Sequence, residues 1–501
     1  MVVGLIAADP RDAAIEADAE RRFGGTLQAR QTRRAEPGPA VYILTAAQNN
    51  THVHAALWRN LLAYAKRRKA KLLVSQFTYN KAQFGEKSIK PGTGQADDYA
   101  KLWYAPEIEP YAYNDRLAIT RSLTFCGETN VLPTAVTPLS GFENYTGRAS
   151  GIFPHTKQAM QSIAALQAAK FNYTTGACTL RNYVQKKAGL KAEHHHAYGA
   201  LIVEVDIDGD WFVRQIRATE DGAFQDLDWR VRDGKVSRGH AVEAINWGDV
   251  HVEQCDPVVR ATNWGAGGIL DTLRPRTQFM HDTFDAYARN HHEMRNPHAM
   301  FTRWSQRRDS IEAELRRVAA FLADESSRSW CKTVVVDSNH DQALTRWLRE
   351  APALADPVNA EFYLQAQRMI YAALAAGRDD FNVFEAVLRA MGVKRAVRFL
   401  GTDESYVICR RSGGVECGMH GHLGANGARG NPRGFSRMGR RVNTGHTHSA
   451  GIIDDCYTAG TSSLLRMSYN RGPSSWSHSH IVTYPNGCRT IITLWRGKWR
   501  G

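Results

Sequence analysis

The chain of 501 residues lacks the features that mark exported or membrane proteins. No run approaches the roughly 18 consecutive apolar residues that a membrane-spanning helix needs. The opening segment, MVVGLIAADPRD, has no basic residue before its short apolar stretch, so it is a poor signal peptide. The eight cysteines are scattered without a CxxC pair, which signals neither a zinc ribbon nor a dithiol redox site and indicates reduced thiols. We therefore expect a cytoplasmic protein with no membrane span.

Acidic residues are scarce relative to basic ones. The 50 Asp and Glu residues are outnumbered by 64 Lys and Arg residues, which gives a net charge of +14. A basic surface attracts polyanions by Coulomb forces and counterion release, so nucleic acid or another phosphate-rich partner is one interpretation. The other interpretation is a charge that only keeps the protein soluble. The length by itself predicts two to three domains.

Composition and periodicity divide the chain into three parts. Residues 1–38 are polar and end in AEPGPA, so we predict a flexible arm there. Residues 39–240 are predicted to form an N-terminal α/β domain, because VYILTA, HVHAALWRNLLAYAKRR and KLLVSQF read as strand, helix and strand. A further helix is expected near residues 156–170. Residues 241–501 are predicted to form a second domain, and no internal repeat of solenoid period is visible.

Two features of the first domain resemble metal motifs but favour structural roles. The runs ALIVEV and WFVRQI flank the turn Asp206–Asp210, which is typical of a β-hairpin. The acidic turn resembles a calcium loop, but its twelfth position holds Arg217 instead of glutamate, so we predict a plain turn. The adjacent His194, His195 and His196 are expected at the surface, because neighbouring side chains point in different directions.

Five short strings in the second domain combine carboxylate, imidazole and amide side chains, which are ligands suited to divalent transition metals. Each string follows a predicted strand. This arrangement indicates a layered α/β fold with a site along one sheet edge. The strings are Asp249-Val250-His251, His281-Asp282, Ser338-Asn339-His340-Asp341, His420-Gly421-His422 and Gly445-His446-Thr447-His448.

The spacing within two of these strings supports a shared ion. Asp249 and His251 are two residues apart, as are His446 and His448. Side chains at positions i and i+2 of an extended strand point the same way, so both members of each pair can approach one metal.

In this order the five strings resemble the calcineurin-like metallophosphoesterase family, whose pattern is D-x-H, G-D, G-N-H-D/E, an H often followed by G-H, and G-H-x-H. The resemblance covers roughly residues 245–455. It implies a mixed α/β fold class, with a C-terminal β-sandwich flanked by helices beside the N-terminal α/β domain. It also implies a dinuclear metal-dependent phosphoesterase with two divalent ions, Mn²⁺ in the first place and Mg²⁺, Fe or Zn²⁺ as alternatives.

The resemblance assigns a role to each motif residue. One metal would be held by Asp249, His251, Asp282 and His448, and the other by Asp282, Asn339, His420 and His446. The two ions would polarise the phosphoryl group and lower the pKa of a shared water. His340 is the expected donor of a proton to the leaving oxygen, and Asp341 is expected to orient that imidazole.

Two positions depart from the family pattern, and two assignments have competitors. His281 and Ser338 stand where the family has glycines, which puts the loop geometry in doubt without removing a ligand. Asp285 follows Asp282 by three residues and exchanges roles with it if the loop is shifted. His422 competes with His420, which we prefer because the family ligand directly precedes a glycine.

The segment between the last two motifs is a basic, glycine-rich loop, GANGARGNPRGFSRMGRR. Its position between ligand motifs predicts a clamp on substrate phosphates, since guanidinium groups match phosphate geometry. The alternatives are a solvated loop or an oligomer contact, and we expect the chain to form a homo-oligomer. The arginines concerned are Arg429, Arg433, Arg437, Arg440 and Arg441.

The N-terminal half carries two further resemblances. Its βαβ start resembles a phosphoesterase opening without ligands, because Ala47-Gln48-Asn49 stands in the place of an Asp-x-His. Strings such as LTFCGETNVLPTAV, SGFENYTGRASGIFPH and YVQKKAGLKAEHHHAYGALIVEVD resemble the phage-encoded DNA-transfer proteins, pre-early proteins of the T-odd coliphage type. That likeness extends from about residue 40 over most of the chain. It implies a phage protein in the bacterial cytoplasm, linked to DNA entry or host-DNA breakdown.

Three hypotheses follow. The first is a DNase that uses two metal ions on a basic surface. The second is a phosphoesterase for small or protein-bound phosphates, which would not need the arginine-rich loop. The third is a DNA-binding protein of phage entry with a vestigial metal site. The complete ligand set argues against the third, because a decayed site usually loses a member.

Overall fold

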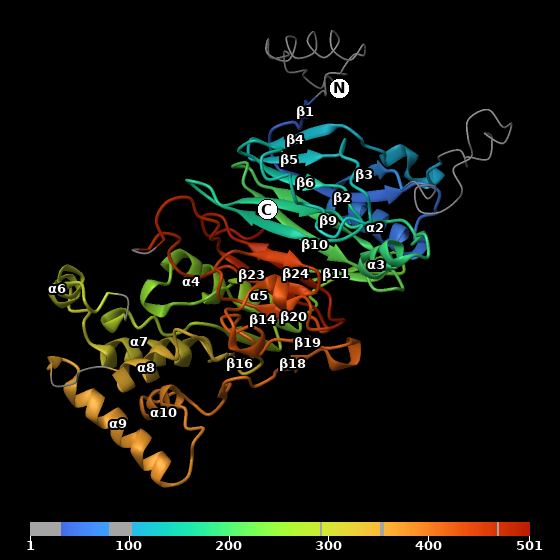
Figure 1. The fold of residues 1–501 in the computed structure, drawn as a ribbon. Helices are drawn as coiled ribbons and strands as arrows, with labels where there is room; N and C mark the ends of the chain where they lie inside the picture. The colour runs from blue at the N-terminus through green and yellow to red at the C-terminus, as the bar shows by residue number, and fades with distance from the viewer. Residues whose placement is uncertain (1–31, 80–102, 291–292, 351–354, 468–469) are drawn as a thin grey trace. The chain divides into compact units, whose positions relative to one another are not determined.

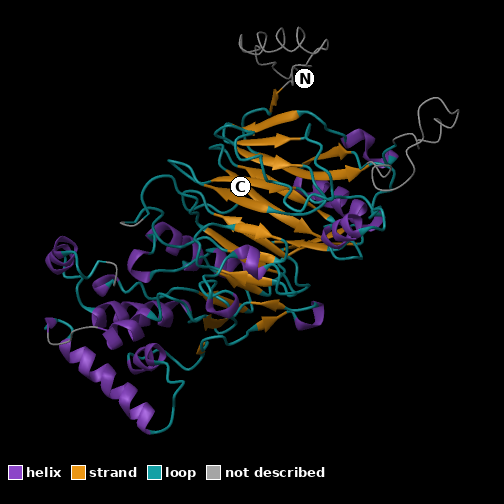
Figure 2. Cartoon of the chain, viewed as in Figure 1, coloured by secondary structure: helices purple, strands orange, loops and turns teal. Residues whose placement is uncertain are grey.

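The structure is a computed structural model that describes residues 32–79, 103–290, 293–350, 355–467 and 470–501 (Figures 1 and 2). Of the predicted arm, residues 1–31 lie outside the described residues, and Thr32–Arg34 form strand β1. The fold is mixed α/β, as expected. No helix of the described ranges is long and apolar enough to cross a bilayer, and all eight cysteines are free thiols.

The chain divides into two compact units. The N-terminal unit comprises Met1–Ile163, Lys170–Arg238 and Arg500–Gly501, and the C-terminal unit comprises Ala164–Ala169 and Gly239–Trp499.

The N-terminal unit is built on a four-stranded sheet of order β10-β9-β2-β3. Strands β2 and β3 are parallel and are joined by helix α2, which packs the apolar face around Leu57 and Leu61 onto the sheet. A second group of strands has the order β1-β4-β5-β6-β8-β7, and a three-stranded meander, β11-β12-β13, packs against α2. The bounds are β2 (Ala40–Gln48), α2 (Ala55–Arg68), β3 (Lys71–Phe77), η3 (Pro106–Tyr111), β4 (Arg116–Thr120), β5 (Leu123–Cys126), β6 (Ser150–Phe153), β7 (Met160–Ile163), β8 (Lys170–Thr174), α3 (Lys187–His195), β9 (Gly199–Val205), β10 (Trp211–Arg217), β11 (Phe224–Asp226), β12 (Trp229–Arg232) and β13 (Lys235–Arg238).

The C-terminal unit contains a six-stranded sheet of order β17-β16-β15-β14-β23-β24. Strands β14 to β17 are parallel, and β15 is buried along its whole length, as parallel strands covered on both faces are. A second set of strands has the order β21-β22-β20-β19-β18. The strand bounds are β14 (Ala244–Asn246), β15 (Thr277–Met280), β16 (Lys332–Val335), β17 (Val397–Phe399), β18 (Val407–Ile408), β19 (Val415–Glu416), β20 (Val442–Thr444), β21 (Gly451–Ile453), β22 (Cys456–Thr458), β23 (Ser479–Thr483) and β24 (Arg489–Thr493).

The core of the C-terminal unit joins its two sets of strands. Phe279 and Val334 from the six-stranded sheet pack with Val415 and Cys417 from the second set. Helices connect the parallel strands, and α7 begins at the N-cap Ser310. The helix bounds are η4 (Val252–Gln254), α4 (Pro257–Trp264), α5 (Ile269–Leu273), η5 (Tyr287–Arg289), α6 (Pro297–Ser305), α7 (Ile311–Glu325), α8 (Ala343–Glu350), α9 (Ala360–Ala375), α10 (Val383–Ala390), η7 (Arg410–Ser412), η8 (Ala425–Gly427) and α11 (Pro432–Phe435).

The helix predicted near residues 156–170 is wrong. This stretch forms β7 and the turn into β8, which pair as antiparallel strands. Its alanines and glutamines favour a helix locally, but tertiary contacts override that preference. The buried amide of Gln158 donates to the carbonyls of Ala200 and Ile216, at 3.2 and 2.9 Å, and thereby fixes the segment in extended form.

The hairpin prediction is confirmed, because β9 and β10 pair in antiparallel register around Asp206–Asp210. Within this turn the Asp206 carboxylate accepts hydrogen bonds from the backbone N–H groups of Asp208 and Asp210, each at 2.9 Å. The surface assignment of the histidine triplet is wrong for His196. That ring is buried and bonds the hydroxyl of Tyr183 and the carbonyl of Thr179.

Candidate metal centre

The ends of two parallel strands bring the first motifs together. Asp249 and His251 follow β14, and His281 and Asp282 follow β15. The backbone keeps the two exits in register, because the N–H groups of Val250 and His251 donate to the carbonyls of His281 and Asp282 at 2.9 and 2.7 Å. Parallel neighbours end at the same sheet edge, so their side chains meet there.

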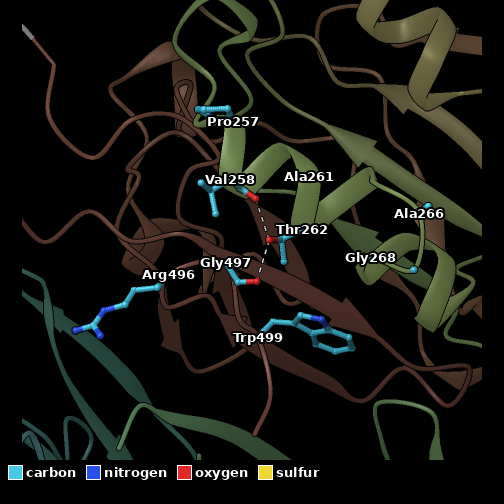
Figure 3. Close-up of a pocket in the computed structure, with 10 residues that line it drawn as sticks. Pro257, Val258, Ala261, Thr262, Ala266, Gly268, Arg496, Gly497 and Trp499 are labelled. Atoms are coloured by element: carbon cyan, nitrogen blue, oxygen red, sulfur yellow. Dashed lines mark hydrogen bonds between the residues drawn. The ribbon is translucent and has the colours of Figure 1, made fainter. Parts of the chain in front are cut away.

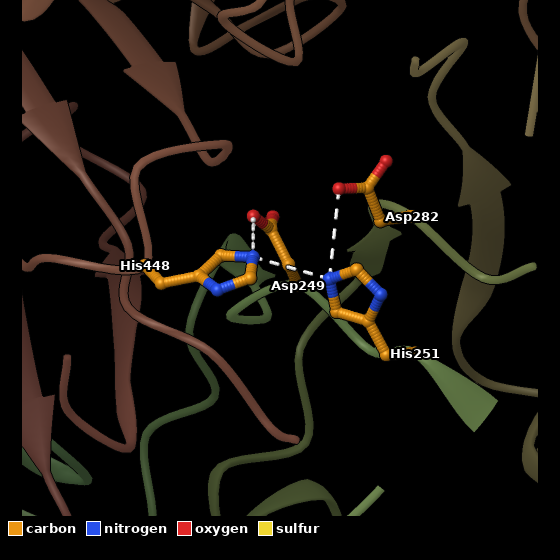
Figure 4. Close-up of side chains that lie close together, drawn as sticks. All are labelled: Asp249, His251, Asp282 and His448. Carbon is orange, nitrogen blue, oxygen red and sulfur yellow. Dashed lines mark hydrogen bonds and ion pairs between the residues drawn. The ribbon is translucent and has the colours of Figure 1, made fainter. Parts of the chain in front are cut away.

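The first group of possible ligands consists of Asp249, His251, Asp282 and His448, whose ligand atoms lie within 4.8 Å of one another (Figure 4). His448 Nε2 lies 3.1 Å from Asp249 Oδ2 and 3.1 Å from His251 Nε2. His251 Nε2 lies 3.7 Å from Asp282 Oδ2. All four side chains are buried. These are the four residues that the sequence pattern assigns to one metal.

The second group shares Asp282 with the first. His420 Nε2 lies 3.3 Å from Asp282 Oδ2 and 3.0 Å from Asn339 Oδ1. Because the same carboxylate oxygen faces both His251 and His420, Asp282 stands in the bridging position. The ring of His446 lies beside that of His420, with 5.1 Å between centroids, but its nitrogens contact neither Asp282 nor Asn339 in the described structure. Three of the four residues predicted for the second metal therefore converge closely.

These residues fit divalent cations by their chemistry and by their unsatisfied atoms. Carboxylate, imidazole and amide donors suit Mn²⁺, Fe or Zn²⁺. Asp249 Oδ1, His420 Nδ1 and His448 Nδ1 are buried without a hydrogen-bond partner among the described residues. Orphaned polar atoms of this kind carry a large desolvation cost unless an ion or water satisfies them.

The electrostatics of the group also call for positive charge. Burial by itself lowers the pKa of His420 and His251, but the surrounding carboxylates outweigh it and raise both pKa values to about 9. Burial by itself raises the pKa of Asp282, but the neighbouring imidazoles hold that pKa well below its usual range. The buried carboxylates thus favour positive charge beside them, which a divalent ion would also supply.

Backbone conformation is strained at several of these positions. His251, Asp282, His446 and His448 have φ values of +46°, +46°, +72° and +55°, in the left-handed region that non-glycine residues rarely adopt. Such strain costs on the order of 1–3 kcal/mol per residue and concentrates at functional sites. Among the described residues twelve further non-glycine positions also have positive φ, so this strain accompanies the site without identifying it.

One glycine is required by close packing against a motif side chain. A Cβ atom on Gly445 would lie 2.2 Å from Asp249 Oδ1. The G-H-x-H motif therefore needs glycine so that the Asp249 carboxylate can sit against the backbone and accept the N–H of His446 at 2.7 Å.

The structure corrects the role expected of Asp341. Its carboxylate accepts hydrogen bonds from the Thr283 hydroxyl and the Phe284 N–H, at 3.0 and 2.8 Å, and it makes no contact with the ring of His340. Burial and the nearby Asp282 raise the pKa of Asp341 to about 7.

Asp285 lies beside the ring of His340, where the sequence had suggested Asp341. Its Oδ1 lies 3.0 Å from His251 Nδ1 and 3.8 Å from His340 Nδ1, and its backbone carbonyl lies 3.3 Å from the same His340 nitrogen. The available signal was its position three residues after Asp282, which we interpreted as a possible exchange of ligands. The side chain of His340 is partly exposed. Its backbone N–H donates to Asp282 Oδ1 at 3.2 Å.

The two replaced glycines disturb neither turn. His281 and Ser338 both lie outside the left-handed region, so these backbones do not require glycine. Ser338 Oγ accepts the N–H of Asp341 at 3.3 Å. His281 is fully buried beside Asp249 and His420, and burial followed by the charge of His420 lowers its pKa to about 4. Its role as a neighbour of the ligands was not anticipated.

His422 and His420 occupy different surroundings. His420 has its Nε2 beside Asp282, whereas the half-buried His422 has no hydrogen-bond partner among the described residues and lines an adjacent cleft. The sequence-based preference for His420 agrees with this placement.

The five arginines of the basic loop separate into two kinds. Arg440 pairs with Glu416 at 3.2 Å, and Arg441 donates to the carbonyls of Ser412, Gly414 and Gly487. The guanidinium of Arg441 is therefore committed to the fold, which leaves it poorly suited to the predicted clamp. The other three arginines are exposed and have no partner among the described residues. They are Arg429, Arg433 and Arg437.

A cleft of about 840 Å³ opens directly onto the motif residues Asn339 and His446. Helix α8 contributes Arg346 and Arg349 to its wall, and Phe381 adds an aromatic ring. The cleft therefore combines two guanidinium groups, four carboxylates and access to the candidate ligands, so its wall carries both signs of charge. The four carboxylates are those of Asp337, Asp341, Asp379 and Asp380.

A second pocket, of about 640 Å³, lies between α4 and the turn that precedes Trp499 (Figure 3). Thr262 joins the two sides, because its hydroxyl bonds the carbonyls of Val258 and Gly497, each at 2.9 Å. None of its ten lining residues carries a carboxylate or imidazole. It offers no metal ligand, so the cleft at Asn339 is the better candidate for substrate.

Comparison with known proteins gives one clear relative. The chain is 40% identical to Protein A1 of Escherichia phage T5 over 474 residues, which cover 91% of this chain and 82% of that protein. No sequence model of a protein family matches the chain, and no solved structure matches it.

Proposed function

The chain belongs to the family of Protein A1 of Escherichia phage T5, and from that premise we propose that this phage protein is a metal-dependent phosphodiesterase that degrades DNA. The observation that carries the proposal is the cluster of buried Asp and His side chains in which Asp282 Oδ2 faces both His251 and His420. The C-terminal unit, a metallophosphoesterase sandwich in this proposal, would hold two divalent ions, with Mn²⁺ preferred and Mg²⁺, Fe or Zn²⁺ as alternatives. Bound there, such ions polarise a phosphoryl group and acidify a water molecule.

The residues around the ions divide the remaining work. Asp249, His251, Asp282 and His448 would hold one ion. Asp282, Asn339, His420 and His446 would hold the other. His340 donates a proton to the leaving oxygen, since its ring is partly exposed beside the ligands. Asp285 orients that imidazole through its carboxylate and carbonyl.

DNA is the proposed substrate because of charge. The net charge of +14 attracts a polyanion, and Arg429, Arg433 and Arg437 are exposed and unpaired within the described residues. Guanidinium groups on a loop between two ligand motifs can bind backbone phosphates while the scissile one lies at the metals. In a phage protein this activity would serve DNA transfer or host-DNA degradation in the host cytoplasm.

The test is incubation of closed circular plasmid with the protein, with and without Mn²⁺. We expect metal-dependent nicking, and loss of at least 10³-fold in rate for Asp282→Ala and for His340→Ala. His298→Ala, on the exposed start of α6, is the matched histidine control and should cleave at the parental rate. Parental cleavage by both site variants would refute the assignment.

The cleft of about 840 Å³ favours a second candidate function, a phosphoesterase for small or protein-bound phosphates, because its size suits a small ligand. Hydrolysis of a chromogenic phosphodiester without any action on plasmid would select this alternative. A purified protein without bound transition metal, active on neither substrate, would instead indicate a DNA-binding phage entry protein with a vestigial site. The homo-oligomer expected from the sequence stays a prediction, and light scattering of the purified protein would measure its mass.

A further inference from the structure

The two compact units repeat one strand topology. In the first sheet, β10-β9-β2-β3 corresponds to β24-β23-β14-β15, and each set has two antiparallel pairs followed by one parallel pair. In the second set, β4-β5-β6-β8-β7 corresponds to β18-β19-β20-β22-β21. Both have the pairing sense antiparallel, parallel, parallel, antiparallel. Agreement in order and sense over nine strands indicates a shared fold.

The hairpins that close the two first sheets also match in detail. Each has a five-residue turn, Asp206–Asp210 between β9 and β10 and Tyr484–Cys488 between β23 and β24. The fourth residue of each turn is a glycine in the left-handed region, Gly209 at φ +78° and Gly487 at φ +76°. In both turns the backbone N–H of the first residue donates to the carbonyl of the fifth, at 2.9 Å.

Strand register then identifies equivalent residues. The isolated parallel bridge between Ala46 and Ala177 corresponds to that between Asp249 and Thr461. By this bridge Ala46 stands where the C-terminal unit has its first motif aspartate, and Gln48 stands where it has His251. Counted along β2 and β14 from the matched hairpins, the equivalents are Thr45 and Ala47, so neither register places a carboxylate or an imidazole there.

The same argument places the other positions. Ala46 pairs with Ser75 across β2 and β3, and the β14–β15 ladder extended by three residues sets Asp249 opposite Asp282. Phe153 pairs with Thr174 as Thr444 pairs with Thr458, so the string His155-Thr156-Lys157 coincides with His446-Thr447-His448. In order, the equivalents of Asp249, His251, Asp282, His420, His446 and His448 are Ala46, Gln48, Ser75, Glu128, His155 and Lys157.

We infer that the N-terminal unit is a second, non-catalytic copy of the C-terminal fold, whose metal site is filled by its own chain. This inference goes beyond the proposed function and does not depend on it. Alanine, glutamine and serine at three ligand positions remove the carboxylates and imidazoles that a divalent ion needs. Lys157 adds a buried ammonium group, which repels a second cation.

Residues 127–136, here named the plug segment, supply the atoms that replace metals. The hydroxyl of Ser75 donates to the carbonyl of Gly127 at 2.6 Å. His155 Nε2 lies 3.1 Å from the carbonyl of Leu132, and Lys157 Nζ donates to the carbonyl of Val136 at 2.8 Å. Three side chains at former ligand positions thus bind three carbonyls of one segment.

The remaining position is neutralised by an ion pair. Glu128 could ligate a metal, but its Oε1 pairs with Arg116 at 2.9 Å and accepts the hydroxyl of Tyr145 at 3.1 Å. Its Oε2 is buried without a hydrogen-bond partner among the described residues, and the positive charge of Arg116 beside it opposes a cation. These equivalent positions therefore lack the carboxylate and imidazole set that phosphate hydrolysis at two metals needs. The acidic group that the described residues of this unit do offer, Asp206, Asp208 and Asp210, lies in the turn between β9 and β10.

Hydrogen–deuterium exchange of the full chain with Mn²⁺ and with EDTA tests the inference segment by segment. We expect Mn²⁺ to slow exchange at residues 249–251, 281–285 and 446–448 in the C-terminal unit. Exchange at the plug segment and at residues 155–157 should be the same in both conditions. Slower exchange of these N-terminal peptides in Mn²⁺ would overturn the inference.

A second experiment tests the inference without metal. Lys157→Met removes the bond to Val136 and should speed exchange of the plug segment about tenfold, whereas Lys191→Met, at an exposed lysine of α3, should not. Ser75→Ala is the milder variant if Lys157→Met fails to fold. Unchanged exchange in these variants would overturn the inference. If Mn²⁺ protected no segment at all, the proposed metal centre would be refuted. The exchange of the Lys157 and Ser75 variants would still decide the role of the N-terminal unit.

Discussion

Asp285 illustrates how one carboxylate can organise two imidazoles. Its Oδ1 lies against His251 and faces His340, so it touches both a candidate ligand and the candidate acid. Hydrogen bonds from carboxylates to metal-binding imidazoles fix the ring tautomer and orientation. Asp341, nearer in sequence to His340, instead secures the loop at Thr283 and Phe284.

Exchange of these two acids for asparagine separates their roles. We expect Asp285→Asn to lower the rate of Mn²⁺-dependent phosphodiester hydrolysis by roughly 10–100-fold, because the imidazoles lose their charged anchor. Asp341→Asn is the matched control and should keep most activity, since an amide oxygen can still accept both hydrogen bonds. Steady-state kinetics on one chromogenic phosphodiester would measure both. A larger loss in Asp341→Asn would restore the role expected from the sequence.

Gly445 provides a steric test of the metal centre. In Gly445→Ala the new methyl group would overlap Asp249 Oδ1, at 2.2 Å, and displace that carboxylate from the first ligand group. We expect at least a tenfold loss of bound metal, measured by elemental analysis after dialysis. Gly434→Ala is the control from the neighbouring loop, because its added Cβ would lie 3.5 Å from the nearest atoms. Equal metal content in the two variants would contradict the ligand role of Asp249.

At the level of elements, strand ends were the most predictable feature. Short buried strands followed at once by Asp, Asn or His indicated the edge formed by β14, β15 and β16, because side-chain period and parallel pairing leave few alternatives. The segment at residues 156–170 was not predictable, since the contacts of Gln158 with β9 and β10 that fix it are distant in sequence.

The basic loop permits a prediction about DNA affinity. We expect the triple variant Arg429→Ala, Arg433→Ala and Arg437→Ala to flatten the dependence of log Kd on log salt concentration by roughly 2–3 units, because each phosphate contact contributes about 0.9. Binding would be measured in a His340→Ala background, which retains the ligands and should not cleave.

The control removes equal charge elsewhere in the C-terminal unit, by changing Lys394, Arg395 and Arg410 to alanine. These side chains are exposed, and no partner is present among the described residues. If both triple variants flatten the salt dependence equally, the effect belongs to net charge and the clamp is refuted.

For the molecule as a whole, the sequence indicated a domain change near residue 240, and the compact units meet at Arg238 and Gly239. Its one indication that the units share a fold was the βαβ start that resembles a phosphoesterase opening, with Ala47 and Asn49 in the place of the ligands, one residue along from the Ala46 and Gln48 that the bridge register gives. Topology depends on strand order and backbone pairing, which tolerate almost any buried side chain, whereas the motif that labels the fold is absent from the first unit. The substitution of Ala46 for the aspartate seen at Asp249 removes that label and keeps the strand.

A chain with one metal-binding unit and one metal-free unit should respond unevenly to chelation. Bound ions stabilise only the unit that holds them, by about 2.7 kcal/mol when the free metal is at 100 times Kd. For a unit of this size that corresponds to a shift in Tm of roughly 5–10 °C. We therefore expect calorimetry of the full chain to show two transitions. The transition assigned to the C-terminal unit should fall in EDTA and recover in Mn²⁺, and the other should stay constant.

The variant Asp282→Asn should remove the metal response of the C-terminal transition without moving the N-terminal one. Asp282 is shared by both ligand groups, and the N-terminal unit has Ser75 at that position. A single transition that EDTA lowers as a whole would mean that the two units unfold cooperatively, and constancy of both transitions would contradict the metal centre itself.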